Sequence, residues 1–297
     1  MRNVITIKTS ESKNPELTLN TANAIALKLM HKKNICVSFG CAKHYADLKI
    51  DDSVSEDSLV LSKKLLFELH LPEYPEYEIK ANGNELVIGP YIGLLITKDD
   101  RNITSSTLNK MLVYVKRYSE LHGAVIVFAL DKIDAENLLI EGYCYNPKLN
   151  FFQTGVFPYP GAFYRKVGLS ALWKNHFLSC MGDKFFNNHY FNKWEMYKWM
   201  SEEEDMSTDI PYTLPYSSES DVFDMLERFD EIYIKPVSGL GGRGIAKIST
   251  DGDTLTVRHR ENGQNRTESL EDRDRAKEYI HELFCDGRYL IQQGIKL

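Results

Sequence analysis

A cluster of four glycines between two predicted strands constrains this chain more than any other feature. Residues 233–248 read YIKPVSGLGGRGIAKI, in which Gly239, Gly241, Gly242 and Gly244 fall within six positions. Glycine lets the backbone adopt positive φ angles and approach a ligand without a Cβ in the way. Such a loop can point several amide N–H groups at one anion. The stretch therefore predicts a tight, ligand-facing loop.

Basic and hydroxyl side chains accompany these glycines. Lys235 ends the strand-like stretch EIYIKP, and Ser238 and Arg243 lie within the loop. Ammonium, hydroxyl and guanidinium groups all suit phosphate oxygens. The following IAKIST, DGD and TLTVRHR indicate a β-hairpin, so the loop joins antiparallel strands and is neither a Walker P-loop nor a dinucleotide-binding turn. We predict phosphate binding; the alternative is a flexible surface hairpin.

A second lysine occupies the first turn of a predicted helix. In FNKWEMYKWM, Asn192 and Glu195 have capping-box spacing, which places Lys193 at the helix start. A positive charge opposes the helix dipole there by about 0.3 to 1 kcal/mol. A nearby anion would remove this conflict, whereas the alternative is that Lys193 extends into solvent. The prolines of DIPYTLPYS are expected to end the helical region and lead into a linker.

The last residues, YLIQQGIKL, indicate a strand that ends in two polar amides. Gln292 and Gln293 carry both donors and acceptors, as recognition of an adenine edge requires. Alternatively, both glutamines are simply exposed at a strand end.

Composition limits the classes of partner. The 297-residue chain has a net charge of −6, so no global basic field would hold nucleic acid or an anionic membrane surface. The five cysteines form no CxxC pair, which argues against a disulfide framework or a zinc site and favours a reducing cytoplasm. No signal peptide and no run of about 18 apolar residues is evident. We expect a cytoplasmic protein that binds neither nucleic acid nor membranes.

The N-terminal region contains an internal similarity at an offset of 42 residues. Residues 17–40 and 59–83 each read as strand, helix and strand, with Asn20 and Ser62 at matching helix N-caps. Neither unit can bury its apolar face alone, so we expect a small barrel with pseudo-twofold symmetry. The alternative is that two amphipathic segments match by chance.

A βαβ unit is predicted next. An apolar strand at residues 91–96, a helix closed by Gly123 and the strand AVIVFAL imply a parallel pair with a right-handed crossover. No GxGxxG opens the helix, so the unit is not expected to bind a dinucleotide. The proline-containing GVFPYPGAFYRKV suggests an edge or connecting strand.

Taken in order, these stretches resemble the YheC/YheD family of endospore coat-associated ATP-grasp proteins. The resemblance rests on NKWEMY, IPYTLP, IKPVSGLGGRGI and YLIQQGI, together with IGPYIGLL and PYPGAFYRKV. It implies an α/β (α+β) fold with a β-rich, barrel-like domain at residues 1–88, a pre-ATP-grasp α/β domain at 89–168 and a partial ATP-grasp domain at 169–297. That last part would be the N-terminal lobe, with the second lobe missing.

The resemblance also implies a set of ATP-binding residues. Lys193 and Lys235 match the two phosphate-contacting lysines, and the segment from Gln292 through Gln293 to Ile295 matches the adenine-binding hinge. Many ATP-grasp enzymes have glutamate in place of Gln292. The phosphate-covering loop corresponds to residues 238–244, with candidate residues Ser238, Gly239, Gly241, Gly242, Arg243 and Gly244.

What the resemblance implies about activity depends on the region after the hinge. Mg²⁺ ligands are expected there in the complete protein, and because the chain stops at Leu297 it is expected to be truncated and inactive alone, with no catalytic or metal residue assigned. We also expect Leu290 and Ile291 to lie on a poorly covered edge strand. The parent would be an ATP-dependent ligase that activates the carboxylate of an unknown acceptor. The alternative is a non-catalytic nucleotide-binding component of the spore coat, with other coat proteins as partners.

Overall fold

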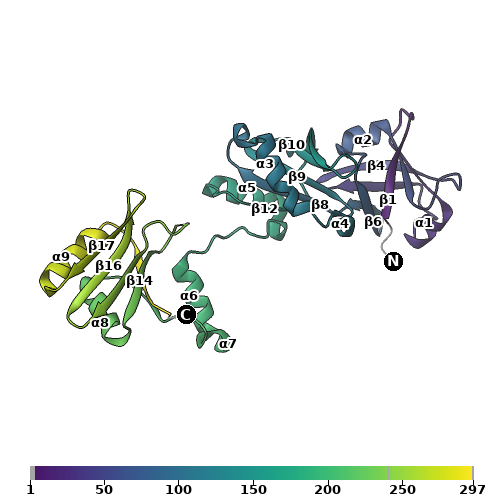
Figure 1. Ribbon diagram of the computed structural model, residues 1–297. Helices are drawn as coiled ribbons and strands as arrows, with labels where there is room; N and C mark the ends of the chain where they lie inside the picture. Colours follow the sequence, from purple (N-terminus) through teal and green to yellow (C-terminus); the bar gives the residue numbers. More distant parts are fainter. Residues whose placement is uncertain (1–3, 240, 296–297) are drawn as a thin grey trace. The chain divides into compact units, whose positions relative to one another are not determined.

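The computed structural model describes residues 4–239 and 241–295, so Leu240 of the predicted loop and the end of the chain at Leu297 lie outside the described residues. The chain divides into two compact units, residues 1–188 and 189–297. Each unit combines β-sheet with helices (Figure 1). The predicted mixed α/β class is therefore confirmed.

A closed β-barrel forms the N-terminal part of the first unit. Alternate strand residues such as Leu17, Leu59 and Tyr77 are fully buried, as expected when one face of each strand lines a core. The barrel-like N-terminal fold predicted from the sequence is confirmed. Around the barrel the strands are β1 (Val4–Ser10), β5 (Ser58–Ser62), β2 (Glu16–Leu19), β4 (Ala42–Ile50), β3 (Asn34–Phe39), β7 (Glu85–Gly89) and β6 (Glu76–Asn82).

The two similar segments adopt the same order of elements within the barrel. In the first, helix α1 (Thr21–Ala26) lies between β2 and β3, and in the second, α2 (Lys63–Leu69) lies between β5 and β6. The side chains of Asn20 and Ser62 cap these helices at the positions predicted. This shared order is what an internal duplication requires, and the duplication itself remains a hypothesis.

A mixed sheet follows the barrel. Strands β8 (Tyr91–Thr97) and β9 (Ala124–Asp134) pair in parallel, as the predicted βαβ unit requires. The single predicted helix between them is instead divided, because the β-branched and aromatic residues Val113, Tyr114 and Val115 have low helix propensity. Its pieces are α3 (Ser105–Met111), the 3₁₀ turn η2 (Leu112–Val115) and α4 (Tyr118–Leu121); the sheet order is β11 (Phe151–Pro158), β10 (Leu139–Asn146), β9, β8 and β12 (Ala162–Arg165).

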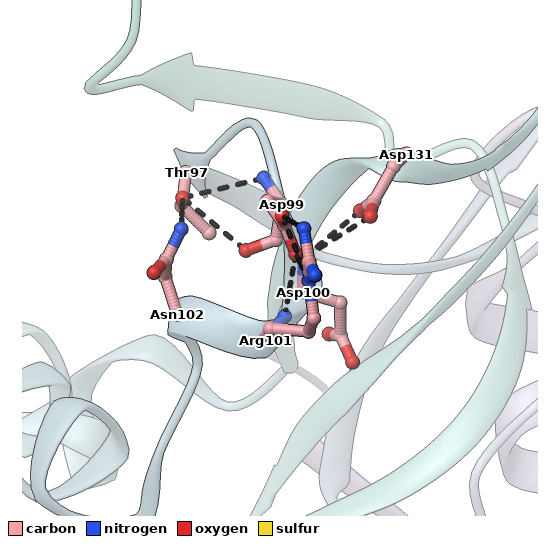
Figure 2. Close-up of polar contacts among 6 residues, drawn as sticks. All are labelled: Thr97, Asp99, Asp100, Arg101, Asn102 and Asp131. Atoms are coloured by element: carbon pink, nitrogen blue, oxygen red, sulfur yellow. Dashed lines mark hydrogen bonds and ion pairs between the residues drawn. The ribbon is translucent and has the colours of Figure 1, made fainter.

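An aspartate-rich turn leaves β8 and starts this crossover (Figure 2). The Asp99 carboxylate accepts hydrogen bonds from the backbone and guanidinium of Arg101, and Asp131 of β9 accepts from the backbone N–H of Asp100. The Arg101 side chain lowers the pKa of Asp99. These carboxylates shape the turn η1 (Asp100–Asn102), which accounts for their clustering.

The first unit extends beyond the predicted boundary at residue 168. Ser170 caps helix α5 (Ala171–Met181), and the buried Phe177 and Met181 pack into the same core as Phe163. The short turn η3 (Gly182–Lys184) ends this part. Burial of α5 places the boundary between compact units after residue 188.

The second unit is an antiparallel sheet with helices α8 (Glu219–Arg228) and α9 (Arg273–Phe284) on one face (Figure 1). Their apolar residues form one core with alternate strand residues, including the fully buried Ile232, Ile248 and Val257. Helices α6 (Lys193–Glu202) and α7 (Glu204–Ser207) precede the sheet. Its strand order is β13 (Thr213–Pro215), β18 (Tyr289–Gln293), β14 (Glu231–Pro236), β15 (Ala246–Asp251), β16 (Thr254–Glu261) and β17 (Gln264–Leu270).

The C-terminal strand β18 is not a poorly covered edge, so that expectation was wrong. It pairs with β14 on one side and with β13 on the other. Leu290 is 3% exposed and Ile291 is fully buried. The physical reason is that residues 213–215, expected to belong to a linker, form an antiparallel strand that satisfies the second edge of β18.

Candidate functional site

The glycine-rich loop joins antiparallel strands, as predicted. Ile234 near the end of β14 pairs with Ala246 at the start of β15, so the intervening residues must turn sharply. A Cβ added to Gly239, Gly241 or Gly242 would meet no protein atom within 4 Å. Packing within the protein therefore does not account for these glycines, and the space beside them is open. The glycines with positive φ are Gly239 (145°), Gly241 (68°), Gly242 (72°) and Gly244 (70°).

The sheet beside the loop separates an apolar face from a polar one. Ile232 and Ile234 of β14 are fully buried on the face covered by α8 and α9. Tyr233 and Lys235 alternate with them and belong to the opposite face. The strand register extends this polar face as a row across neighbouring strands: Thr213, Gln292, Tyr233, Lys247 and Arg258.

Lys235 is a half-buried ammonium without a carboxylate partner among the described residues. Its Nζ donates to Oε1 of Gln292 at 2.5 Å and lies 5.2 Å from the ring centre of Tyr233. Burial, and secondly the positive charge of Lys193, lower the pKa of Lys235. Its surroundings therefore oppose its charge, although a hydrogen bond and an aromatic ring partly offset this.

Lys193 approaches the same loop from helix α6. The capping box between Asn192 and Glu195 is present as predicted, and α6 begins at Lys193. The Lys193 Nζ donates to the carbonyl oxygens of Pro236 at 2.9 Å and Gly239 at 3.2 Å. These carbonyls satisfy part of the hydrogen-bonding capacity of the ammonium but carry no formal charge. The lysine thus lies against the start of the glycine loop, and no described carboxylate neutralises its charge.

The difference between Lys235 and Lys247 shows what is unusual about the site. Both ammonium groups lie near the Tyr233 ring, at 5.2 and 6.0 Å from its centre. Lys247 forms an ion pair with Glu231 at 2.6 Å, whereas Lys235 has the neutral Gln292 as its acceptor. Two positive charges are therefore held near each other beside the loop with no local neutralisation by the described side chains.

Of the three predicted hinge residues, Gln292 and Gln293 form side-chain hydrogen bonds and Ile295 is exposed. Both ends of the Gln292 amide are engaged, Oε1 by Lys235 and Nε2 by the Thr213 hydroxyl. Oε1 of Gln293 accepts from the backbone N–H of Tyr212, and Ile295 is exposed. The Gln292 side chain is thus part of the lysine site, and its role toward adenine remains a prediction.

The other predicted residues line the loop itself. Arg243 is exposed. Ser238 lies between Lys235 and the first glycine at the start of the loop. The structure therefore brings the two lysines and Gln292 together and leaves Arg243 at the surface.

Two site residues were missed by the sequence analysis. Thr213 is buried and hydrogen-bonded to Gln292, and Tyr233 packs beside both strand lysines. Strand alternation in EIYIKP could have placed Tyr233 on the face of Lys235. Thr213 could not be found in this way because its short strand was read as a linker.

Within residues 4–239 and 241–295 there is no group of three or more side chains suited to hold a metal ion. Asp251 and Asp253 are exposed around the β15–β16 turn, and Glu261 pairs with Arg266. The magnesium site expected for a complete protein is therefore not assigned to any described residue.

The family of the C-terminal part follows from its sequence. Residues 182–297, which include α6, the glycine loop and β18, match the model of the family described as YheC/D like ATP-grasp. This part of the chain belongs to the YheC/D-like ATP-grasp family. The Endospore coat-associated protein YheD of Bacillus subtilis (strain 168) is 26% identical over 264 residues, covering 82% of this chain and 56% of YheD. The chain thus spans little more than half the length of this relative.

Several solved ATP-grasp proteins show weak structural similarity. D-alanyl-alanine synthetase A from Vibrio cholerae has a TM-score of 0.33 at 12% identity, covering 70% of this chain and 61% of the synthetase. The ATP-grasp ligase PsnB, solved with a minimal precursor, Mg and ADP, has a TM-score of 0.31 at 14% identity, with 69% and 65% covered. At these scores neither similarity contributes to the assignment.

No helix formed by the described residues is long and apolar enough to cross a membrane.

Proposed function

We propose that this YheC/D-like ATP-grasp segment binds ATP, and that Lys193, Lys235 and the glycine loop hold its phosphates. The observation that carries the proposal is the pair of ammonium groups beside one loop, neither of which has a carboxylate partner among the described residues, in a chain whose net charge is −6. Like charges held together lower the stability of a fold unless an anion relieves them. A triphosphate would supply that anion.

The residues present fit the phosphates of a nucleotide. Amide groups of positive-φ glycines form concave anion sites, and the open space beside Gly241 and Gly242 leaves room for phosphate oxygens. The exposed guanidinium of Arg243 forms no ion pair with the described residues, and a planar guanidinium is suited to phosphate oxygens. Mg²⁺ would supply further charge neutralisation in the complete protein.

For the complete protein we propose an ATP-dependent carboxylate-activating ligase. In this reaction a carboxylate oxygen attacks the γ-phosphorus, ADP leaves, and a nucleophile such as an amine then displaces phosphate from the acyl phosphate. Membership of an ATP-grasp family supports this reaction class. The acceptor substrate remains unidentified.

The second candidate is a non-catalytic nucleotide-binding component of the spore coat. The name of the relative YheD, an endospore coat-associated protein, favours it. In this case other coat proteins would be partners, and the fold would bind nucleotide without turnover. We propose a cytoplasmic protein that associates with the coat.

Calorimetric titration of ATP into the chain and into its Lys235→Ala variant tests nucleotide binding. Loss of a charged hydrogen bond should weaken affinity by about 1.5 to 3 kcal/mol, roughly 10- to 150-fold. Equal affinities for the two proteins would remove Lys235 from the site. Trapping of an acyl phosphate by hydroxylamine in the longer protein would favour the ligase, and ATP binding without turnover would favour the coat component.

A further inference from the structure

We infer that Thr213 is a positioning residue of the phosphate site, which through Gln292 fixes a neutral acceptor against the ammonium of Lys235. The inference rests on the proposed role of Lys235. It concerns a residue that is hydrogen-bonded to Pro211 and Gln292 and that, in the proposal, does not contact the nucleotide.

The direction of the hydrogen bonds around Thr213 determines the orientation of Gln292. Thr213 is 4% exposed, and its single hydroxyl hydrogen is donated to the carbonyl oxygen of Pro211 at 2.9 Å. The hydroxyl oxygen can then only accept from its other neighbour. The amide nitrogen Nε2 of Gln292 lies 3.0 Å away and is the donor.

This arrangement directs the opposite end of the amide toward Lys235. Oε1 of Gln292 accepts from the Lys235 Nζ at 2.5 Å. A flipped amide would place its NH₂ group against the Lys235 ammonium and its oxygen against the Thr213 hydroxyl, which has no hydrogen left to donate. Amide orientation is usually ambiguous, but here the donor and acceptor pattern allows only one choice.

The hydrogen bonds from Thr213 through Gln292 to Lys235 form a relay, and the strand register holds this relay in place. Thr213 of β13 is directly opposite Gln292 of β18, and Gln292 is opposite Tyr233 of β14. Three adjacent strands therefore fix the relay from Thr213 to Lys235. Without the hydroxyl, Gln292 could rotate and leave the ammonium without its acceptor.

A neutral acceptor suits an anion site better than a carboxylate. The charged groups around Lys235 are Lys193 from α6 and, beyond the Tyr233 ring, Lys247, whose charge is paired with Glu231. A glutamate at position 292 would neutralise Lys235 as Glu231 neutralises Lys247. Gln292 instead orients the ammonium and preserves its positive charge for a ligand.

The test compares Thr213→Val, which removes only the hydrogen-bonding group, with Thr213→Ser, which retains it. Thr256→Val is the matched control, because Thr256 lies on the polar side of β16, two strands from β14. In the nucleotide-free full chain, the Lys235 side chain is titrated by NMR with labelled lysine. Thr213→Val should move its titration midpoint to lower pH, and the other two variants should leave it unchanged.

ATP affinity provides the second measurement. Thr213→Val should bind ATP about 3- to 10-fold more weakly than the unchanged chain, as expected for loss of one hydrogen bond, and Thr213→Ser should restore binding. An unchanged Lys235 midpoint in a folded Thr213→Val protein would overturn the inference. A shifted midpoint in a chain that does not bind ATP would support the relay and refute the proposed function.

Gln292→Glu tests the same contact with the opposite sign and does not depend on the folding of Thr213→Val. A carboxylate beside Lys235 stabilises the charged ammonium, so the Lys235 midpoint should move to higher pH. The same midpoint in Gln292→Glu and the unchanged chain would contradict the contact on which the relay depends.

Discussion

Replacement of Lys235 by methionine should weaken ATP binding without destabilising the nucleotide-free protein. The substitution keeps the length of the side chain and removes its charge. The ammonium donates one hydrogen bond to Gln292, but burial and the charge of Lys193 lower its pKa. Because water screens this half-buried group, the effect should be small. We expect Lys235→Met to raise the free energy of unfolding by only about 0 to 1 kcal/mol.

Lys247→Met is the matched control for this experiment. Lys247 lies near the same tyrosine ring but is paired with Glu231 at 2.6 Å. Its removal leaves a carboxylate without its partner, so the variant should lose about 0.2 to 1 kcal/mol of stability. The two lysine substitutions should therefore change stability in opposite directions.

The pH dependence gives the same prediction an independent check. Because the pKa of Lys235 is lowered from its ordinary value near 10.5, the folded state binds fewer protons than the unfolded state between the two pKa values. The contribution of Lys235 to stability should rise with pH through that window, and Lys235→Met should lack this rise. Urea denaturation at several pH values measures both effects. A loss of stability in Lys235→Met equal to that in Lys247→Met would refute the electrostatic reasoning.

Three further predictions concern the loop, the sheet and the thiols. Gly241→Ala should cost about 1 to 2 kcal/mol of backbone strain in the folded state, as should Gly252→Ala at φ 59° in the β15–β16 turn, but only Gly241→Ala should weaken ATP binding in calorimetry. Ile291→Ala should lower the free energy of unfolding by about 2 to 5 kcal/mol in urea denaturation because Ile291 is fully buried; a loss below about 1 kcal/mol would contradict its placement. Burial raises the pKa of the Cys144 thiol to about 12, so mass spectrometry after iodoacetamide treatment near pH 8 should find the exposed Cys180 alkylated and Cys144 unmodified.

Local sequence signals predicted several elements in both units well. The capping box at Asn192, the hairpin after the glycine loop and the caps at Asn20 and Ser62 each depend on residues a few positions apart. The physical interactions that fix these features are contained in short stretches of chain. Such features can be read from sequence without knowledge of the tertiary fold.

Features that depend on distant residues could not be read in this way. The strand at residues 213–215 is too short to show a period, and it forms because it pairs with β18, almost eighty residues later in the chain. The sequence showed that the positive charge of Lys193 opposes the helix dipole. It could not show that the fold brings two backbone carbonyl oxygens within hydrogen-bonding distance of the Lys193 ammonium. The Thr213 and Gln292 relay was hidden for the same reason.

The most direct test of the phosphate site is an NMR titration of ATP into the uniformly ¹⁵N-labelled chain, which detects weak binding and locates it. The account predicts that the largest chemical-shift changes occur at the amides of Gly239, Gly241, Gly242 and Gly244 and at the side-chain signals of Lys193 and Lys235. Inorganic triphosphate should perturb the same signals. Saturating changes elsewhere in the second unit, with the loop and both lysines unaffected, would contradict the account.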